Sequence, residues 1–292
     1  MEQSIVTAVF LPLALGIIML GMGMTLTLHD FRRVFLYPKA ILIGLGNQLL
    51  LLPLLGFGLA LAFGLKAEFA VGLMLLALCP GGATSNIISH LAKADLALSI
   101  SLTAISSTIT NFSIPIFLNL ALFYFMGGEQ AIQLPIAQTM LQIFVVTLLP
   151  VTLGMWIKSR FPAFTERSLK AVNLISAVFF VLILLLAIVK ERANIIPYFQ
   201  QAGLAALSLN AGALLAGYFI GKLWGLSRPQ NMAISIETGI QNGTLAIALA
   251  LSPAVLNNTQ MAIPPAIYSL IMFVTAAVVV VLSRRKVGRE AE

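Results

Sequence analysis

Apolar residues fill nine long stretches of the chain, and short polar segments separate them. The stretches cover residues 4–26, 39–64, 67–91, 96–126, 132–157, 168–190, 199–222, 229–252 and 260–283. Each is long enough to cross a hydrocarbon core of about 30 Å as an α-helix that rises about 1.5 Å per residue. Lipid offers no hydrogen bonds, so a lone spanning segment must satisfy its own backbone as a helix. We therefore predict an all-α polytopic membrane protein with nine transmembrane helices, built as a single unit over residues 1–292.

Polar residues and glycines interrupt two of these stretches. The first interruption runs Cys79-Pro80-Gly81-Gly82-Ala83-Thr84-Ser85-Asn86, and the second runs Glu237-Thr238-Gly239-Ile240-Gln241-Asn242-Gly243-Thr244. Proline removes a backbone donor, and glycine weakens a helix. A broken helix leaves carbonyl groups that favour cations at the end of its first half, and N–H groups that favour anions at the start of its second. We predict that the two interruptions meet and bind ions and solute.

Glu237 is the one acidic residue that the pattern places deep within an apolar stretch. A charge at that depth costs at least about 2.5–3.5 kcal/mol, so it marks a functional site by default. No lysine or arginine lies at a matching depth, which leaves a bound cation or a proton to neutralise the carboxylate. Na⁺ is a hard cation that prefers oxygen ligands. Further oxygens are available from Ser99 and Thr103, which share one helix face, and from Gln48 in the second stretch.

Composition and charge narrow the class of protein. The chain is 60% hydrophobic and 9% charged, whereas an ordinary soluble domain is roughly 25% charged. The net charge of +7 is interpreted as a topology signal, and nucleic-acid binding is not expected. With the N-terminus outside, fourteen of the seventeen lysines and arginines fall on the inner side. We predict a multi-pass protein of the cell inner (plasma) membrane with a cytoplasmic C-terminus, whose first stretch is a retained helix.

The two interrupted stretches cross the membrane in opposite directions, which is typical of an inverted-repeat transporter with two crossing broken helices. Residues 132–283 would form a complete repeat, and residues 4–126 would form the other repeat without its first helix. Stretch 168–190 is apolar all round. It is expected to face lipid and to carry little chemistry.

The interrupted segments resemble those of the bile acid:sodium symporter family, which includes bacterial homologues of the apical sodium-dependent bile acid transporter. The matching residues are 79–86, Ala97-Leu98-Ser99 with Thr103, 237–242, and Gly21-Met22-Gly23-Met24-Thr25-Leu26 with Asp30-Phe31. The resemblance covers nearly the whole chain. It implies a core domain, approximately 39–126 and 199–283, that moves against a panel domain, approximately 4–26 and 132–190.

The resemblance also implies two sodium sites. By position, the first would be formed by Ser85, Asn86, Ser99, Thr103 and Glu237. The second would be formed by Gln48, Glu237 and Gln241, together with the main-chain carbonyls of Thr238 and Ile240. All of these side chains are of the type that the family requires, so sodium coupling is expected.

The solute is expected to be a small carboxylate such as pantoate, with a bile-acid-like anion less favoured. Ala83 stands where some prokaryotic members have threonine, and Met272-Phe273 stand where some members have a His-Asn pair. The residues expected to hold the carboxylate are Ala83, Thr84, Asn242 and Gly243, at the start of the second half-helices.

The expected function is secondary active symport of Na⁺ and an organic anion by alternating access, in a monomer or weak dimer within the lipid bilayer. One alternative is an H⁺-coupled carrier that uses Glu237, and a channel is another. An intramembrane enzyme is a remote alternative, because the chain has neither a His-Glu-x-x-His zinc motif nor a Gly-x-Ser-x-Gly elbow. No catalytic residues are therefore predicted.

Overall fold

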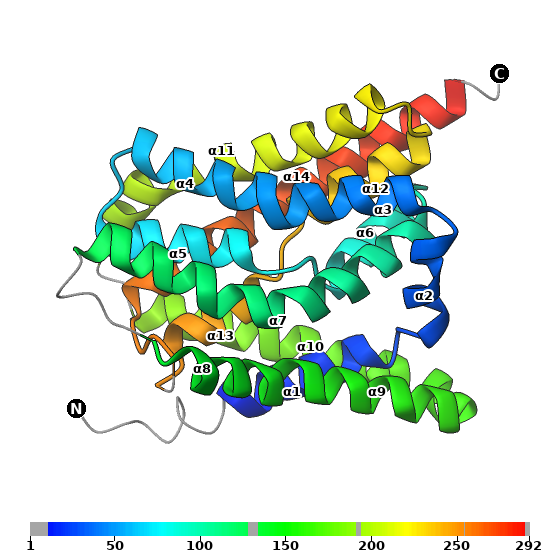
Figure 1. The fold of residues 1–292 in the computed structure, drawn as a ribbon, viewed down its shortest axis with the longest axis horizontal. Coiled ribbons are helices and arrows are strands. Elements are labelled where there is room, and N and C mark those ends of the chain that lie inside the picture. The colour runs from blue at the N-terminus through cyan, green and yellow to red at the C-terminus, as the bar shows by residue number, and fades with distance from the viewer. Residues whose placement is uncertain (1–10, 128–133, 191–193, 254, 290–292) are drawn as a thin grey trace.

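The structure is a computed structural model that describes residues 11–127, 134–190, 194–253 and 255–289 (Figure 1). Every regular element of these residues is a helix. Five helical stretches are long and apolar enough to cross a membrane: Pro38–Ala62, Leu96–Met126, Ile136–Arg160, Ile196–Leu223 and Gln260–Arg284. Shorter apolar helices cover Pro12–Gly23 and Ala67–Leu78. The chain is thus an all-helical polytopic membrane protein, while nine crossings and the inverted repeat stay predictions.

The helices follow the apolar stretches closely. In chain order they are α1 (Leu11–Gly23), α2 (Leu28–Arg32), η2 (Arg33–Phe35), α3 (Pro38–Gly46), η3 (Asn47–Leu51), α4 (Leu52–Ala62), α5 (Ala67–Leu78), α6 (Ala83–Leu91), α7 (Leu96–Met126), α8 (Ile136–Ile143), η5 (Phe144–Leu148), α9 (Leu149–Arg160), α10 (Pro162–Lys190), α11 (Ile195–Leu223), α12 (Arg228–Gly239), α13 (Gly243–Leu251), η7 (Gln260–Ala262) and α14 (Ile263–Arg289).

Both interruptions break their helices, as predicted. The first lies between α5 and α6, and the second lies between α12 and α13. The extended residues of the two breaks pass each other in antiparallel directions, with Gly81 opposite Gln241. The backbone N–H of Asn242 donates to the carbonyl of Pro80 at 2.9 Å. Two segments far apart in the sequence therefore meet at the centre of the molecule, as Figure 1 shows.

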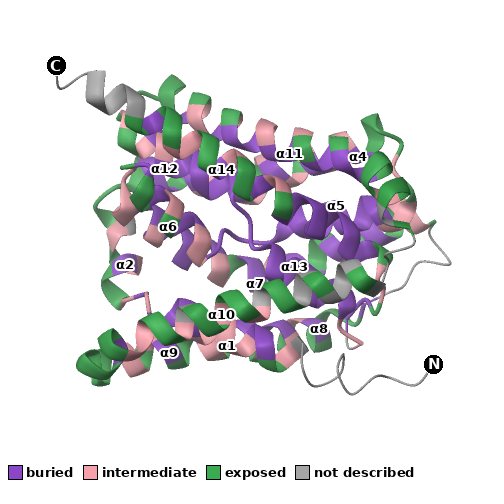
Figure 2. Ribbon diagram, turned by 180° about the vertical axis from the view of Figure 1, so that it is seen from behind, coloured by how far each residue is buried: buried purple, intermediate pink, exposed green. Residues whose placement is uncertain are grey.

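The helices surround this meeting point from two sides. In Figure 1, α1, α8, α9 and α10 lie on one side, and α3, α4, α11, α12 and α14 lie on the other, with α5, α6, α7 and α13 between them. Buried residues gather at the centre of the molecule, especially in α5 and α13 (Figure 2). Large apolar side chains on the outer helices, such as Leu174 and Leu204, are exposed as expected for contact with lipid. The crossing of the half-helices is therefore shielded on both sides.

Two helices contain a π-helical turn just before a proline. η3 precedes Pro53, and η5 precedes Pro150. Proline has no N–H and clashes with the carbonyl one turn earlier, and a widened turn relieves that clash. Each widened turn carries a buried polar side chain, Gln48 in η3 and Thr147 in η5. Through these turns, the two prolines help to orient the side chains of Gln48 and Thr147 toward the interior.

Candidate functional site

The Glu237 carboxylate lies buried among hydroxyl groups. Glu237 is near the end of α12 and is 2% exposed. Ser85 Oγ donates to Glu237 Oε2 at 2.7 Å, and Ser99 Oγ lies 3.2 Å from the same oxygen. Thr103 Oγ1 donates to Glu237 Oε1 at 2.6 Å. Three helices, α6, α7 and α12, therefore direct their polar side chains to one point. We call Ser85, Asn86, Ser99, Thr103 and Glu237 the carboxylate cluster.

Asn86 completes this cluster and makes it rich in acceptors. Its Oδ1 lies 3.0 Å from Ser99 Oγ and 3.3 Å from Thr103 Oγ1. The hydroxyls of Ser85, Ser99 and Thr103 carry one hydrogen each. They face five acceptor oxygens, namely both Glu237 oxygens, Asn86 Oδ1 and the carbonyls of Gly82 and Ser99. A cation would satisfy the lone pairs that these hydrogens leave unpaired.

In the part of the chain that the structure describes, no basic side chain pairs with the Glu237 carboxylate. Among the same residues, no group of three or more His, Cys, Asp or Glu side chains could hold a metal ion. The donor set consists of one carboxylate, one amide oxygen and three hydroxyls. Such a set suits a hard monovalent cation.

A second polar group joins Gln48 to the break in α12. Gln48 Nε2 donates to the carbonyl of Cys79 at 2.8 Å and lies 3.0 Å from Gln241 Oε1. Gln241 Nε2 lies 2.6 Å from the carbonyl of Thr238 and 3.3 Å from that of Glu237. Gln48, Gln241 and two carbonyls are therefore together, and Glu237 joins them through its main chain. The carbonyl of Ile240 joins no hydrogen bond of this group.

One glycine of the first break lies very close to the Glu237 carboxylate. A Cβ on Gly81 would overlap Glu237 Oε1 and would lie 2.7 Å from Glu237 Cδ. A Cβ on the neighbouring Gly82 would meet nothing closer than Asn242 Cβ, at 3.7 Å. Neither glycine has a positive φ. The requirement at Gly81 is therefore one of space beside the carboxylate.

Sequence reasoning missed three residues that support the site. Ser89 Oγ donates to Ser99 Oγ at 3.0 Å. Asn210 Nδ2 and Tyr268 OH each donate to the carbonyl of Gly239 at 2.8 Å, which satisfies a carbonyl left open where α12 ends. Asn210 and Tyr268 are both fully buried. Other polar residues lie close to them in the sequence, Ser208 near Asn210 and Ser269 beside Tyr268, so the pattern gave no signal that singled them out.

A cavity of about 320 Å³ adjoins the crossing. All four residues predicted to bind solute line it: Ala83, Thr84, Asn242 and Gly243. Met272 and Phe273 line it from α14. The first turns of α6 and α13 both border this cavity, and none of the described residues that line it is a lysine, arginine or histidine. The two helix N-termini contribute a positive field to the cavity.

Asn242 both caps a helix and faces the cavity. Its Oδ1 accepts a hydrogen bond from the backbone N–H of Leu245 at 3.0 Å, which caps α13. The amide nitrogen points away from that bond, and the residue is 8% exposed. Asn242 can therefore donate to a bound group without giving up its role as the cap.

Helix α10 differs from its expected role. Stretch 168–190 was predicted to face lipid, and Leu174, Ile175 and Val178 are indeed exposed. Ser176 and Ala177, however, line the cavity beside the crossing. This stretch therefore does not face lipid on all sides, while its having little chemistry stays a prediction. An apolar pattern without periodicity gives no sign of which face of a helix borders a cavity.

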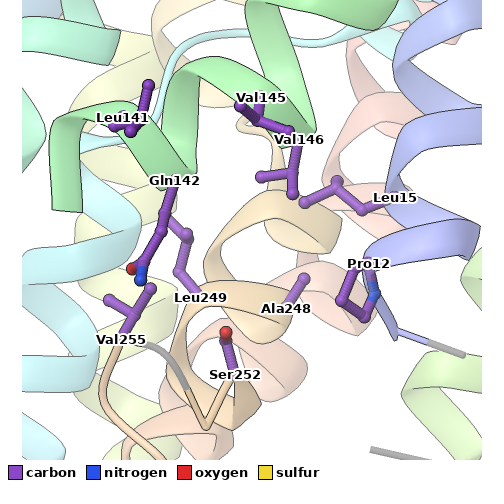
Figure 3. A pocket seen from close by; sticks show the side chains of 10 residues that line it. All are labelled: Pro12, Leu15, Leu141, Gln142, Val145, Val146, Ala248, Leu249, Ser252 and Val255. Carbon is purple, nitrogen blue, oxygen red and sulfur yellow. The ribbon is translucent and has the colours of Figure 1, made fainter. Parts of the chain in front are cut away.

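A second cavity, of about 290 Å³, lies between α1, α8, η5 and the end of α13 (Figure 3). Its lining is apolar except for Gln142 and Ser252. α1 contributes Pro12 and Leu15 here, whereas it contributes Ile18, Met19 and Met22 to the first cavity. The two cavities thus lie at opposite ends of α1.

Comparison of the sequence with known protein families and proteins finds sodium-dependent transporters. Residues 12–197 match the model of the sodium bile acid symporter family. The uncharacterized sodium-dependent transporter YocS of Bacillus subtilis is 33% identical over 264 residues, which are 89% of this chain and 78% of that protein. A probable chloroplastic sodium/metabolite cotransporter of Oryza sativa subsp. japonica is 30% identical over 93% of this chain and 63% of its own length. The ileal sodium/bile acid cotransporter of Cricetulus griseus is 28% identical over 94% and 78%.

Proposed function

The chain belongs to the sodium bile acid symporter family of sodium-dependent transporters, and on that premise we propose that it couples Na⁺ to the symport of a small organic anion by alternating access. The observation that carries this proposal is the carboxylate cluster. Glu237 is buried among three hydroxyl groups and the amide oxygen of Asn86, without a basic partner among the described residues. A buried charge of this kind needs a counter-ion. Na⁺ fits the oxygen donors.

We assign two sodium sites to the crossing. The first is the carboxylate cluster. The second is the group of Gln48, Gln241 and the carbonyls of Glu237, Thr238 and Ile240, which Na⁺ would enter after the Gln241 amide turns its oxygen toward these carbonyls. The main chain of Glu237 would then connect both sites. Because the broken helices meet at these residues, ions bound here stabilise the crossing against which the solute binds.

The solute site is the 320 Å³ cavity beside the crossing. A carboxylate at the N-termini of α6 and α13 would accept hydrogen bonds from backbone N–H groups and from the Asn242 amide. The volume and the apolar wall at Met19, Met22 and Met272 favour a small organic anion with an apolar body. Sodium would raise solute affinity, and solute would raise sodium affinity by the same factor.

The proposed topology has nine crossings, with the N-terminus outside. α1 then runs from the outer side to the inner side, so the 320 Å³ cavity is the inner cavity and the 290 Å³ cavity is the outer cavity. The panel domain, α1 and α8 to α10, would move against the core domain, α3 to α7 and α11 to α14. Such movement would open each cavity in turn to its own side of the membrane.

Removing sodium is the direct test of coupling. In liposomes that contain the purified protein, an inward Na⁺ gradient should drive accumulation of a labelled monocarboxylate such as pantoate, and an equal K⁺ gradient should not. Na⁺, and not K⁺, should also raise the thermal unfolding temperature without any solute. Equal stabilisation by the two ions together with equal uptake would refute sodium coupling. Uptake that follows a pH gradient and ignores Na⁺ would make Glu237 a proton carrier.

Asn242→Ser should separate solute binding from folding. Serine is a good N-cap, so α13 stays capped, but the amide donor to the solute is lost. We expect the KM for a carboxylate solute to rise about 10- to 150-fold, as for the loss of one hydrogen bond to a charged group, while Na⁺-induced stabilisation stays unchanged. Thr108→Ser on α7, whose hydroxyl bonds the Ala104 carbonyl at 2.9 Å, is the control. An unchanged KM in Asn242→Ser would remove this residue from the solute site.

A further inference from the structure

A line of polar side chains continues from the inner cavity toward the outer side. Ser107, Thr110 and Asn111 on α7 and Thr147 on η5 surround a narrow space together with Asn242. Met19 and Asn242 border both this space and the inner cavity. The space measures about 10 Å³, which is no more than one water molecule needs. Nothing in the sodium clusters or the inner solute site uses these four side chains.

A hydrogen bond holds this space closed. The hydroxyl of Thr147 donates to Asn111 Oδ1. Asn111 Nδ2 in turn donates to the carbonyl of Ser107 at 2.7 Å. Asn111 and Thr147 are each 5% exposed. Because α7 belongs to the proposed core domain and η5 to the proposed panel domain, this bond joins the two parts that would move against each other.

The bond can break at little cost. Thr147 Oγ1 also lies 2.6 Å from the carbonyl of Ile143 in its own helix. Its single hydrogen can therefore move to that acceptor when α7 and η5 separate, and no buried donor is left unpaired. The closed state also leaves one polar group unsatisfied, because the buried hydroxyl of Ser107 has no hydrogen-bond partner among the residues that the structure describes. Opening the space to water would hydrate it.

We propose that Ser107, Thr110, Asn111 and Thr147 line the outer half of the solute path, and that the bond from Thr147 to Asn111 is the latch that closes it. This proposal rests on the proposed transport function and adds a gate and a set of solute contacts to it. The four side chains carry three hydroxyl groups and one amide. They therefore suit uncharged hydrogen-bonding groups of the passing solute, such as its own hydroxyl groups. The carboxylate is held by Asn242 and the helix N-termini.

Thr147→Val tests the latch, because valine keeps the shape and removes the hydroxyl. A Ser107→Cys reporter is labelled in sealed vesicles of known orientation by a membrane-impermeant thiol reagent added on the outer side. Thr147→Val should raise the labelling rate about five-fold, as expected when one hydrogen bond no longer favours the closed state. Protein without the reporter measures the background from the buried Cys79.

Two further variants keep the test decisive. Asn111→Leu removes the acceptor and should raise the rate similarly, and the double variant should add little, because both changes break one bond. Thr152→Val on α9 removes a hydroxyl that bonds only the Leu149 carbonyl of its own helix, and should leave the rate unchanged. Equal rates in Thr147→Val and the wild type, or the same increase in Thr152→Val, would overturn the latch. If labelling rises but uptake ignores Na⁺, the latch stands and sodium coupling fails.

Discussion

Glu237→Gln should abolish Na⁺-driven uptake and leave a folded protein. Glutamine keeps the size of the side chain and one acceptor oxygen, and its amide can hydrogen-bond to the hydroxyls of Ser85 and Thr103. The charge that attracts Na⁺ is lost. Removing one partner of a buried charge pair costs about 3–5 kcal/mol, so Na⁺ affinity should fall by at least about 100-fold. Na⁺-induced thermal stabilisation measures the loss of Na⁺ affinity, and transport assays in liposomes measure the loss of Na⁺-driven uptake.

The stability of Glu237→Gln without sodium is the informative control. A carboxylate without its ion is costly when buried, so the variant should unfold at the same temperature as the sodium-free wild type or higher. Glu166→Gln, at an exposed position of α10, should behave as the wild type throughout. Near-normal Na⁺-driven uptake by Glu237→Gln would exclude the carboxylate cluster as a sodium site.

Gly81→Ala should weaken sodium binding strongly, whereas Gly82→Ala should not. The methyl group at residue 81 would overlap the Glu237 carboxylate, which must then move away from Thr103 or push the two breaks apart. Overpacking of this kind costs about 1–3 kcal/mol, which predicts a loss of about 5- to 150-fold in Na⁺ affinity. At residue 82 the methyl group would make an ordinary contact at 3.7 Å. We expect a change there within about two-fold.

These adjacent glycines form a matched pair. Both lie in the same break and have backbone angles that alanine can adopt, so a general effect on the flexibility of the break would appear in both variants. Na⁺ titration followed by thermal unfolding compares them directly. Equal losses in the two variants would show that the break needs flexibility and would contradict the close approach of Gly81 to Glu237.

Much of the architecture could be predicted from the sequence because lipid imposes strict rules. Apolar stretches of sufficient length must form helices, and Pro80 with two glycines favours a kink or a break in one of them. The prediction that residues 79–86 and 237–244 meet is confirmed by the bridge between Gly81 and Gln241. The sodium and solute roles of these residues stay proposals. The residues themselves were identifiable because polar groups at that depth are rare.

Other parts of the site gave no comparable signal. Ser176 stands in a uniformly apolar stretch, where the pattern shows no preferred face. Asn111 and Thr147 are two polar residues among many in their helices, and only the packing of α7 against η5 makes them partners. Whether a hydroxyl bonds its own helix or a neighbour depends on that packing.

The sequence by itself determined that this chain lies in a membrane, that two of its helices break, and that Glu237 needs compensation, because hydrocarbon cannot solvate a charge. Only the tertiary structure decided which groups surround the charge of Glu237. The crossing of α5–α6 with α12–α13 turns the Glu237 carboxylate toward Ser85, Ser99 and Thr103, and its carbonyl toward Gln241. Helical periodicity specifies the face of one helix. The angle and depth at which several helices meet come from packing among all of them.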